Sequence, residues 1–278
     1  MALFEKLMAL DRRWIFLLTW IFVLFPLTNP LGLPVSIGRD STRWKQYIDD
    51  LPDGSIVLVS MDFGVSAMPE LYPMTVATMH QIWQRDFKVV VVAFWNQGPL
   101  VFDTLLGEMK PEQTYGVVYG EDWIELGWVP GAETGMAALG NDIWAACPKD
   151  YLLKNDVSSF PIMQNIRKAT DVDLIVSIES GTPGLTEWLR QWNDPYGVKI
   201  IVGCTAVSVS GMIPFRDSGQ LSALMPGLSA CAEYEKLVGR AGLAIAGVDA
   251  ISMTHLLLVL LVIVGNVAFF ATRARGKS

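Results

Sequence analysis

The chain has 278 residues, of which 51% are hydrophobic and only 18% are charged, against about 25% charged residues in a typical soluble domain. The net charge is −7, and the region between the two basic ends holds 15 basic and 26 acidic residues, a net charge of −11. Such an acidic region is repelled by phosphate backbones, which excludes nucleic acid as an expected partner, and it should also stand off from anionic lipid headgroups. The three cysteines show no CxxC spacing, so neither a disulfide framework nor a zinc or other metal site is expected.

The first apolar segment runs from Trp14 to Leu27 and continues less uniformly to Val35. A bilayer crossing needs about 20 residues, which this segment supplies if the helix tolerates a kink near Pro26. The alternative is a cleaved signal peptide, because the uninterrupted apolar run is short. No small-x-small cleavage site follows Leu27, which favours an uncleaved anchor. We therefore expect a short basic tail over residues 1–13 and a transmembrane helix over 14–35.

Strand and helix patterns alternate from Ser55 onward, within a single expected domain over residues 36–250. Strands are expected at 55–61, 88–94, 115–119, 173–178 and 199–204, and helices at about 69–85, 99–109, 131–147, 185–192 and 218–238, the last broken near Pro226. This alternation predicts an α/β fold with a mostly parallel, Rossmann-like doubly wound sheet and helices on both faces.

Polar residues and glycines follow four of the expected strands, and in a parallel sheet these loops meet at one edge. They are Asp62 in the first loop, Asn96 and Gln97 in the second, Ser180, Gly181, Thr182 and Gly184 in the third, and Thr205 in the fourth. The third loop precedes a helix, whose free N–H groups favour an anion. A tight turn with an ordinary N-cap is the alternative interpretation.

No catalytic residue can be assigned from the sequence, because no nucleophile–base pair and no known nucleotide-binding motif is present. Acid–base chemistry would depend on Asp62 and Glu179, which also have an alternative interpretation as turn or cap residues. Two carboxylates beside an anion repel it unless one is protonated or paired with a cation. The nature of any cofactor is left open.

The second apolar segment covers residues 251–271 and is followed by a basic tail over 272–278. Asn266 lies inside this segment, where its amide requires a partner on another helix, as in self-association, or on its own backbone. Two spans place both termini on one side of the cell membrane. Arginines directly beside the apolar runs favour cytoplasmic termini and an extracytoplasmic domain.

Several short phrases together resemble a family of prokaryotic two-span membrane proteins of uncharacterised activity, with a central α/β domain. The phrases are LMALDRR (7–13), DLPDGS (50–55), MPELYPM (68–74), SGTPG (180–184), GCTAVS (203–208), SGQL (218–221) and AEYE (232–235). The resemblance implies an anchored α/β domain but carries over no activity and no site residues.

Two functions are therefore expected as alternatives. The first is a scaffold or assembly subunit of a membrane complex, favoured by tryptophans expected at the surface, namely Trp123, Trp128 and Trp144. The second is an enzyme or receptor that binds a small anionic ligand at the carboxyl ends of the strands.

Overall fold

The computed structural model describes residues 11–275, with side chains to Arg273, so most of the basic N-terminal tail and the last residues of the C-terminal tail lie outside the described part. The chain forms two compact units, Ser36–Ala244 and a second unit made of the segments on either side of it. The α/β domain therefore ends at Ala244, six residues earlier than expected, because the last helix already begins at Leu243.

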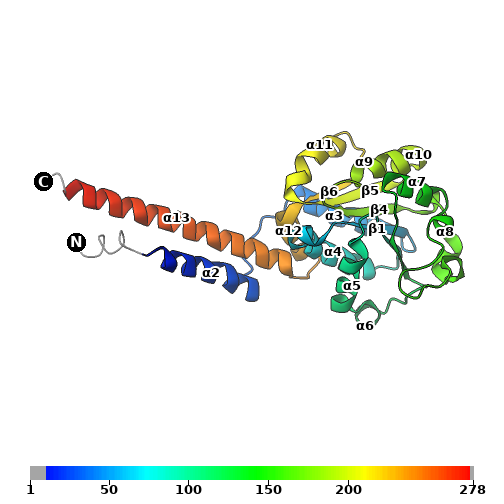
Figure 1. Ribbon diagram of the computed structural model, residues 1–278, viewed down its shortest axis with the longest axis horizontal. Coiled ribbons are helices and arrows are strands. Elements are labelled where there is room, and N and C mark those ends of the chain that lie inside the picture. Colours follow the sequence, from blue (N-terminus) through cyan, green and yellow to red (C-terminus); the bar gives the residue numbers. More distant parts are fainter. Residues whose placement is uncertain (1–10, 276–278) are drawn as a thin grey trace. The chain divides into compact units, whose positions relative to one another are not determined.

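The α/β domain contains one sheet of six parallel strands in the order β3-β2-β1-β4-β5-β6 (Figure 1). The strands are β1 (Ile56–Asp62), β2 (Lys88–Ala93), β3 (Trp123–Trp128), β4 (Leu174–Glu179), β5 (Lys199–Cys204) and β6 (Ala223–Pro226). Continuous runs such as KVVVVA in β2 suit strands that are covered on both faces. The expected α/β class is confirmed, and the strand order is that of doubly wound, Rossmann-like sheets.

Helices cover both faces of the sheet (Figure 1). One face carries α3 (Arg39–Asp49), α4 (Met68–Trp83), α5 (Gly98–Met109) and α12 (Gly227–Leu237). The other carries α7 (Glu133–Asn141), α8 (Ile143–Ala146), α9 (Leu185–Trp188), the π-helical turn Leu189–Asn193 and α11 (Val209–Asp217). Shorter helices are α6 (Pro111–Tyr115) and α10 (Asp194–Tyr196), with 3₁₀ turns at Val65–Ala67, Val157–Ser159, Pro161–Asn165, Ala169–Asp171 and Ala206–Ser208.

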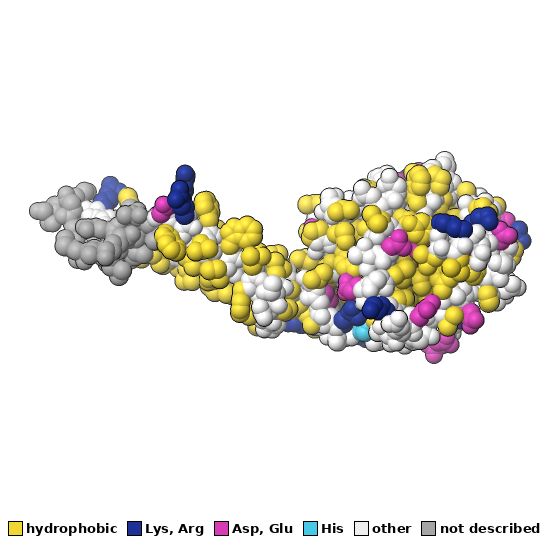
Figure 2. Space-filling view, turned by 60° about the horizontal axis from the view of Figure 1, so that its bottom comes forward, with side chains coloured by type: hydrophobic (Ala, Val, Ile, Leu, Met, Phe, Trp, Pro, Cys, Tyr) yellow, Lys and Arg dark blue, Asp and Glu magenta, His cyan; other side chains and the backbone are white. Residues whose placement is uncertain are grey.

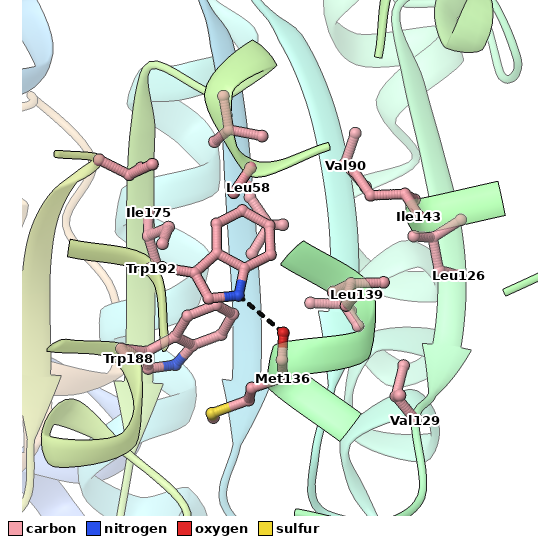
Figure 3. Close-up of a cluster of buried hydrophobic side chains, with 14 of the residues drawn as sticks. Leu58, Val90, Leu126, Val129, Met136, Leu139, Ile143, Ile175, Trp188 and Trp192 are labelled. Atoms are coloured by element: carbon pink, nitrogen blue, oxygen red, sulfur yellow. Dashed lines mark hydrogen bonds between the residues drawn. The ribbon is translucent and has the colours of Figure 1, made fainter. Parts of the chain in front are cut away.

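The core under α7 and α9 is built around two tryptophans (Figure 3). Trp188 and Trp192 are fully buried, and their rings meet edge to face with centroids 5.4 Å apart. The indole nitrogen of Trp192 donates to the carbonyl oxygen of Met136 at 2.9 Å (Figure 3). This bond connects α7 to the turn that follows α9. Leu58 of β1 and Ile175 of β4 belong to the same buried cluster.

The strand expected at residues 115–119 was wrong. Tyr115 ends α6, and the third strand begins at Trp123. Gly116 and Gly120 both adopt positive φ, which turns the chain twice before the strand starts. The true strand was missed because Glu125 and Gly127 interrupt its apolar pattern.

The helix expected at residues 218–238, with a break near Pro226, is confirmed only after that break, and its first part was wrong. The segment holds the edge strand β6 and then α12, which begins directly after it at Gly227, a residue with positive φ. Pro226 has no N–H to donate, so it suits the last position of an edge strand. Helix α3, whose buried face holds Trp44 and Ile48, had not been predicted.

The second unit contains α2 (Arg12–Thr28) and α13 (Leu243–Arg275). Over Leu243–Arg273, α13 is long and apolar enough to cross a membrane, and its exposed surface is hydrophobic (Figure 2). Helix α2 has only 17 residues, about 25 Å at a rise of 1.5 Å per residue. Asn266 donates its amide N–H to the carbonyl oxygen of Val262 at 2.7 Å. Of the two partners considered for this amide, it therefore bonds the backbone of its own helix.

The loop after α2 is bonded to α13 by one buried side chain. Asp249 accepts the backbone N–H groups of Leu31, Gly32 and Leu33 at 2.8, 2.8 and 3.1 Å. These residues are more than 200 positions from Asp249 in the sequence, so the two ends of the chain are joined within this unit.

Candidate functional site

Two buried carboxyl groups lie side by side where the strand order reverses, the position at which doubly wound sheets bind ligands. Asp62 ends β1 and Glu179 ends β4, and the two residues are register partners, as are Ser60 and Ser177. Each serine therefore precedes its acid by two positions on the same face of the sheet. Both acids are almost completely buried.

Each acid is hydrogen-bonded by the protein itself. Asp62 accepts from the Ser60 hydroxyl at 2.5 Å and the Phe94 N–H at 2.7 Å. Glu179 accepts from the Ser177 hydroxyl at 2.8 Å and the Leu185 N–H at 2.9 Å. Burial raises the pKa of Asp62 to about 7, with these hydrogen bonds opposing the shift. Burial, with a smaller contribution from the charge of Asp62, raises the pKa of Glu179 to about 8.

The loop between β4 and α9 has little free capacity for an anion. The N–H of Gly184 donates to Glu187 at 2.8 Å, and that of Leu185 donates to Glu179. The protein's own carboxylates thus occupy two of the donors that would hold a ligand at this helix start. A Cβ added at Gly184 would lie 2.5 Å from a carboxyl oxygen of Glu179, so the glycine permits this close approach.

The other predicted loops make internal contacts. The side-chain oxygen of Gln97 accepts the N–H of Val65 at 3.0 Å, while Asn96 is exposed. Thr205 is buried and bonded to Ser208 at 3.1 Å. The N–H of Ala206 in the same loop donates to Glu70 at 2.9 Å.

A pocket of about 220 Å³ lies between the β4–α9 loop and α11. It brings together Gly181, Thr182 and Gly184 of the predicted residues, whereas its lining does not include Asp62, Asn96, Gln97, Ser180 or Thr205. Glu179 and Glu187 also line it, and no basic residue does. The arrangement is therefore electrostatically unsuited to an anion.

Apolar side chains stand exposed at the same edge of the sheet. Val65 follows β1, Leu100 lies in the first turn of α5 after β2, Trp128 ends β3 and Val207 follows β5. Their exposed fractions are 56%, 61%, 48% and 87%. We refer to these four residues as the carboxyl-edge patch. Its three aliphatic members were not predicted, although a valine three residues after a strand, where polar turn residues are usual, is a readable signal.

The expected surface tryptophans behave differently from one another. Trp128 is exposed and Trp144 is half-buried. The surface position expected for Trp123 was wrong, because only 3% of this side chain is accessible. It packs among the rings of Trp83, Phe102 and Tyr119. Its apolar neighbours on α4 and α5 lie far away in the sequence, so this burial leaves no local pattern.

Within residues 11–275, no group of three or more His, Cys, Asp and Glu side chains is arranged to hold a metal ion. All three cysteines are buried as free thiols, and burial raises the pKa of both Cys147 and Cys204 to about 12. His80 lies on α4, where its ring is bonded to the Tyr115 hydroxyl at 2.7 Å. Comparison with protein families, curated proteins and solved structures found no match for this chain.

Proposed function

We propose that this protein is a membrane-anchored scaffold whose α/β domain binds a protein partner through the carboxyl-edge patch. The observation that carries this proposal is the exposure of Val65, Leu100, Trp128 and Val207 at or just beyond the carboxyl ends of β1, β2, β3 and β5. Parallel strands lie about 4.8 Å apart, so these side chains are spread along one continuous edge. Exposed apolar residues with a tryptophan among them are typical of protein interfaces.

The chemistry of the adjacent loops favours a protein partner over a small anionic ligand. Glu179 and Glu187 already accept the N–H groups at the start of α9, and no basic side chain lines the pocket there. A protein partner needs neither free N–H groups nor a deep pocket. Burying an apolar side chain contributes about 25 cal/mol per Å² removed from water.

The scaffold is anchored by both ends of the chain in this proposal, with α2 as a short second span beside α13. The bonds from residues 31–33 to Asp249 support a common position for the end of α2 and the start of α13. Both termini lie on the cytoplasmic side of a prokaryotic cell membrane in this proposal. Cysteines introduced at Leu3 and Gly276 should react with an impermeant reagent from the same side, and labelling from opposite sides would contradict two spans.

Site-specific photocrosslinking in cells tests the partner surface. A photoreactive residue at position 207 should give a discrete protein adduct, and Val65→Asp in the same chain should reduce it. Val118 is the matched control, because it is 45% exposed but precedes β3 at the opposite edge of the sheet.

The scaffold proposal fails if positions 207 and 118 give the same adducts, or if position 207 gives none while the protein is folded and in the membrane. Melting of purified Val65→Asp, followed by circular dichroism, separates loss of binding from loss of the fold. Val65 is an exposed side chain, so a change in stability within about 0.5 kcal/mol is expected.

A further inference from the structure

An open polar hollow of about 960 Å³ lies between the first half of α3 and the end of α11. Three arginines line it: Arg39 and Arg43 from α3, and Arg216 from α11. Its acidic lining residues are Asp40 and Asp217. In a domain with a strong excess of acidic residues, this is a place where basic side chains outnumber acidic ones.

The acidic side chains around the hollow already have partners. Arg216 contacts Asp40 at 3.4 Å and Asp217 at 3.0 Å. Glu233, behind the start of α3, accepts the N–H of Gly38 at 2.7 Å and the Ser41 hydroxyl at 2.6 Å.

Arg39 and Arg43 have no hydrogen-bond or ion-pair partner in the part of the chain that the structure describes. They are four positions apart on one helix, so the two positive charges face the same way and repel each other. Arg39 is also the first residue of α3, where the helix dipole disfavours a cation. An anion bound between the two guanidinium groups would relieve both conflicts.

We infer that Arg39, Arg43 and Arg216 bind a phosphate-bearing anion. A guanidinium group presents parallel N–H donors that match two phosphate oxygens, and it keeps its charge at any physiological pH. The hollow is much larger than a phosphate ion, so it suits a phosphate ester with a polar body. Thr42 and Gln46, which also line it, supply neutral hydrogen-bonding groups for that body.

Two sources provide this chemistry, a phospholipid headgroup and a soluble phosphate ester. Ten residues, 29–38, connect the end of α2 to Arg39. An extended chain spans at most about 3.3–3.6 Å per residue, so α3 is tethered within roughly 35 Å of the end of α2. A headgroup is within that reach if α2 lies in the membrane. The inference itself depends on neither the scaffold function nor the second span.

The test uses the full chain in neutral detergent and the double variant Arg39→Gln/Arg43→Gln. The control is Lys168→Gln/Lys199→Gln, which removes the same charge from exposed side chains that do not line the hollow. One arm measures phosphatidylglycerol retained over phosphatidylcholine by native mass spectrometry. The other titrates inorganic pyrophosphate and follows the melting temperature. Circular dichroism should show all three proteins equally folded, since Arg39 and Arg43 are exposed and make no hydrogen bond or ion pair in the described part of the chain.

We expect at least one probe to bind the wild type and the control about tenfold or more tightly than the arginine variant. Selective retention of phosphatidylglycerol alone identifies the lipid as the source, and a response to pyrophosphate identifies soluble phosphate esters. The inference is overturned if neither probe distinguishes the arginine variant from the control.

Discussion

Asp62 and Glu179 are register partners on the neighbouring strands β1 and β4, and both carboxyl groups accept hydrogen bonds from serine hydroxyl and backbone N–H groups of the domain. Because water is excluded, the neutral form of each acid is favoured in the folded state. In the folded domain both acids therefore keep a proton at pH values up to about 7.

The domain should lose stability as the pH rises from about 4 to about 8. Asp62 and Glu179 titrate near their ordinary values of 3.8 and 4.5 when unfolded, and at about 7 and 8 when folded. The folded state then binds more protons in this window, so unfolding becomes easier with increasing pH. Burial raises the pKa of Glu125 to about 8 as well, which adds to the same trend. Melting temperatures at pH 5 and pH 8 check this, and equal values would contradict it.

Asp62→Asn should flatten that dependence and raise stability at pH 8. An amide keeps an oxygen for the Phe94 N–H and carries no charge to desolvate. One pKa unit corresponds to about 1.4 kcal/mol, so a gain on the order of 1–3 kcal/mol at pH 8 is expected. Asp173→Asn is the control: this exposed residue lies just before β4, where its side chain accepts the Ile56 N–H at 2.8 Å, and an amide there keeps an oxygen for that bond, so the pH profile should stay that of the wild type. Destabilisation of Asp62→Asn at pH 8 would show that the carboxylate is required in its charged form.

Trp192→Phe should cost more stability than Trp83→Phe. Both indoles are buried, but only Trp192 donates a hydrogen bond, to the carbonyl oxygen of Met136. The indole nitrogen of Trp83 has no partner among the described residues. The difference should be about 1 kcal/mol, the usual net value of a buried hydrogen bond. Chemical denaturation followed by circular dichroism measures both variants, and equal losses would assign no net stabilisation to the bond.

Asp249→Ala should loosen the loop after α2. The N–H groups of residues 31, 32 and 33 lose their acceptor, which should lower the stability of this contact by about 1–3 kcal/mol where water does not fully replace the carboxylate. Hydrogen exchange at residues 31–33 should become faster, while amides in β1 and β4 keep their protection. Asp249→Asn retains one acceptor oxygen and should show an intermediate effect. Unchanged exchange in Asp249→Ala would mean that the loop is held by other contacts.

Asn266→Leu tests self-association through α13. The amide donates to its own helix, but its oxygen is available to a second copy, and Gly265 beside it has open space at its Cβ position. We expect a weaker oligomer in detergent, by about 1 kcal/mol or less per contact. Light scattering across a concentration series measures the change. A monomeric wild type at every accessible concentration would rule out this mode of association.

The sequence predicted the parallel α/β domain because β1, β2, β4 and β5 are continuous apolar runs with turn residues after them. It failed at β3 and β6, the two edge strands, where Glu125, Gly127 and Pro226 obscure the pattern. An edge strand pairs with a neighbour on one side only, so its composition is less constrained than that of a central strand.

The site was predicted only in outline. The order of the loops along the chain placed Asp62 and Glu179 at one edge, and the sheet brings them into register. Their hydrogen bonds to Ser60 and Ser177 follow from the two-residue period of a strand. The use of the α9 N–H groups by Glu179 and Glu187 could not be predicted, because it depends on side-chain conformation in a loop.

The contact between Asp249 and residues 31–33 also bears on how the protein is made. The segments it joins lie on either side of Ser36–Ala244, so the α/β domain is synthesised in full after one segment and before the other. The domain has its own core and sheet. Until Asp249 has been synthesised, the N–H groups of residues 31–33 lack the acceptor that they have in the folded protein. Translation of α13 supplies the missing carboxylate, so the contact between the two segments can form only after the α/β domain has been synthesised.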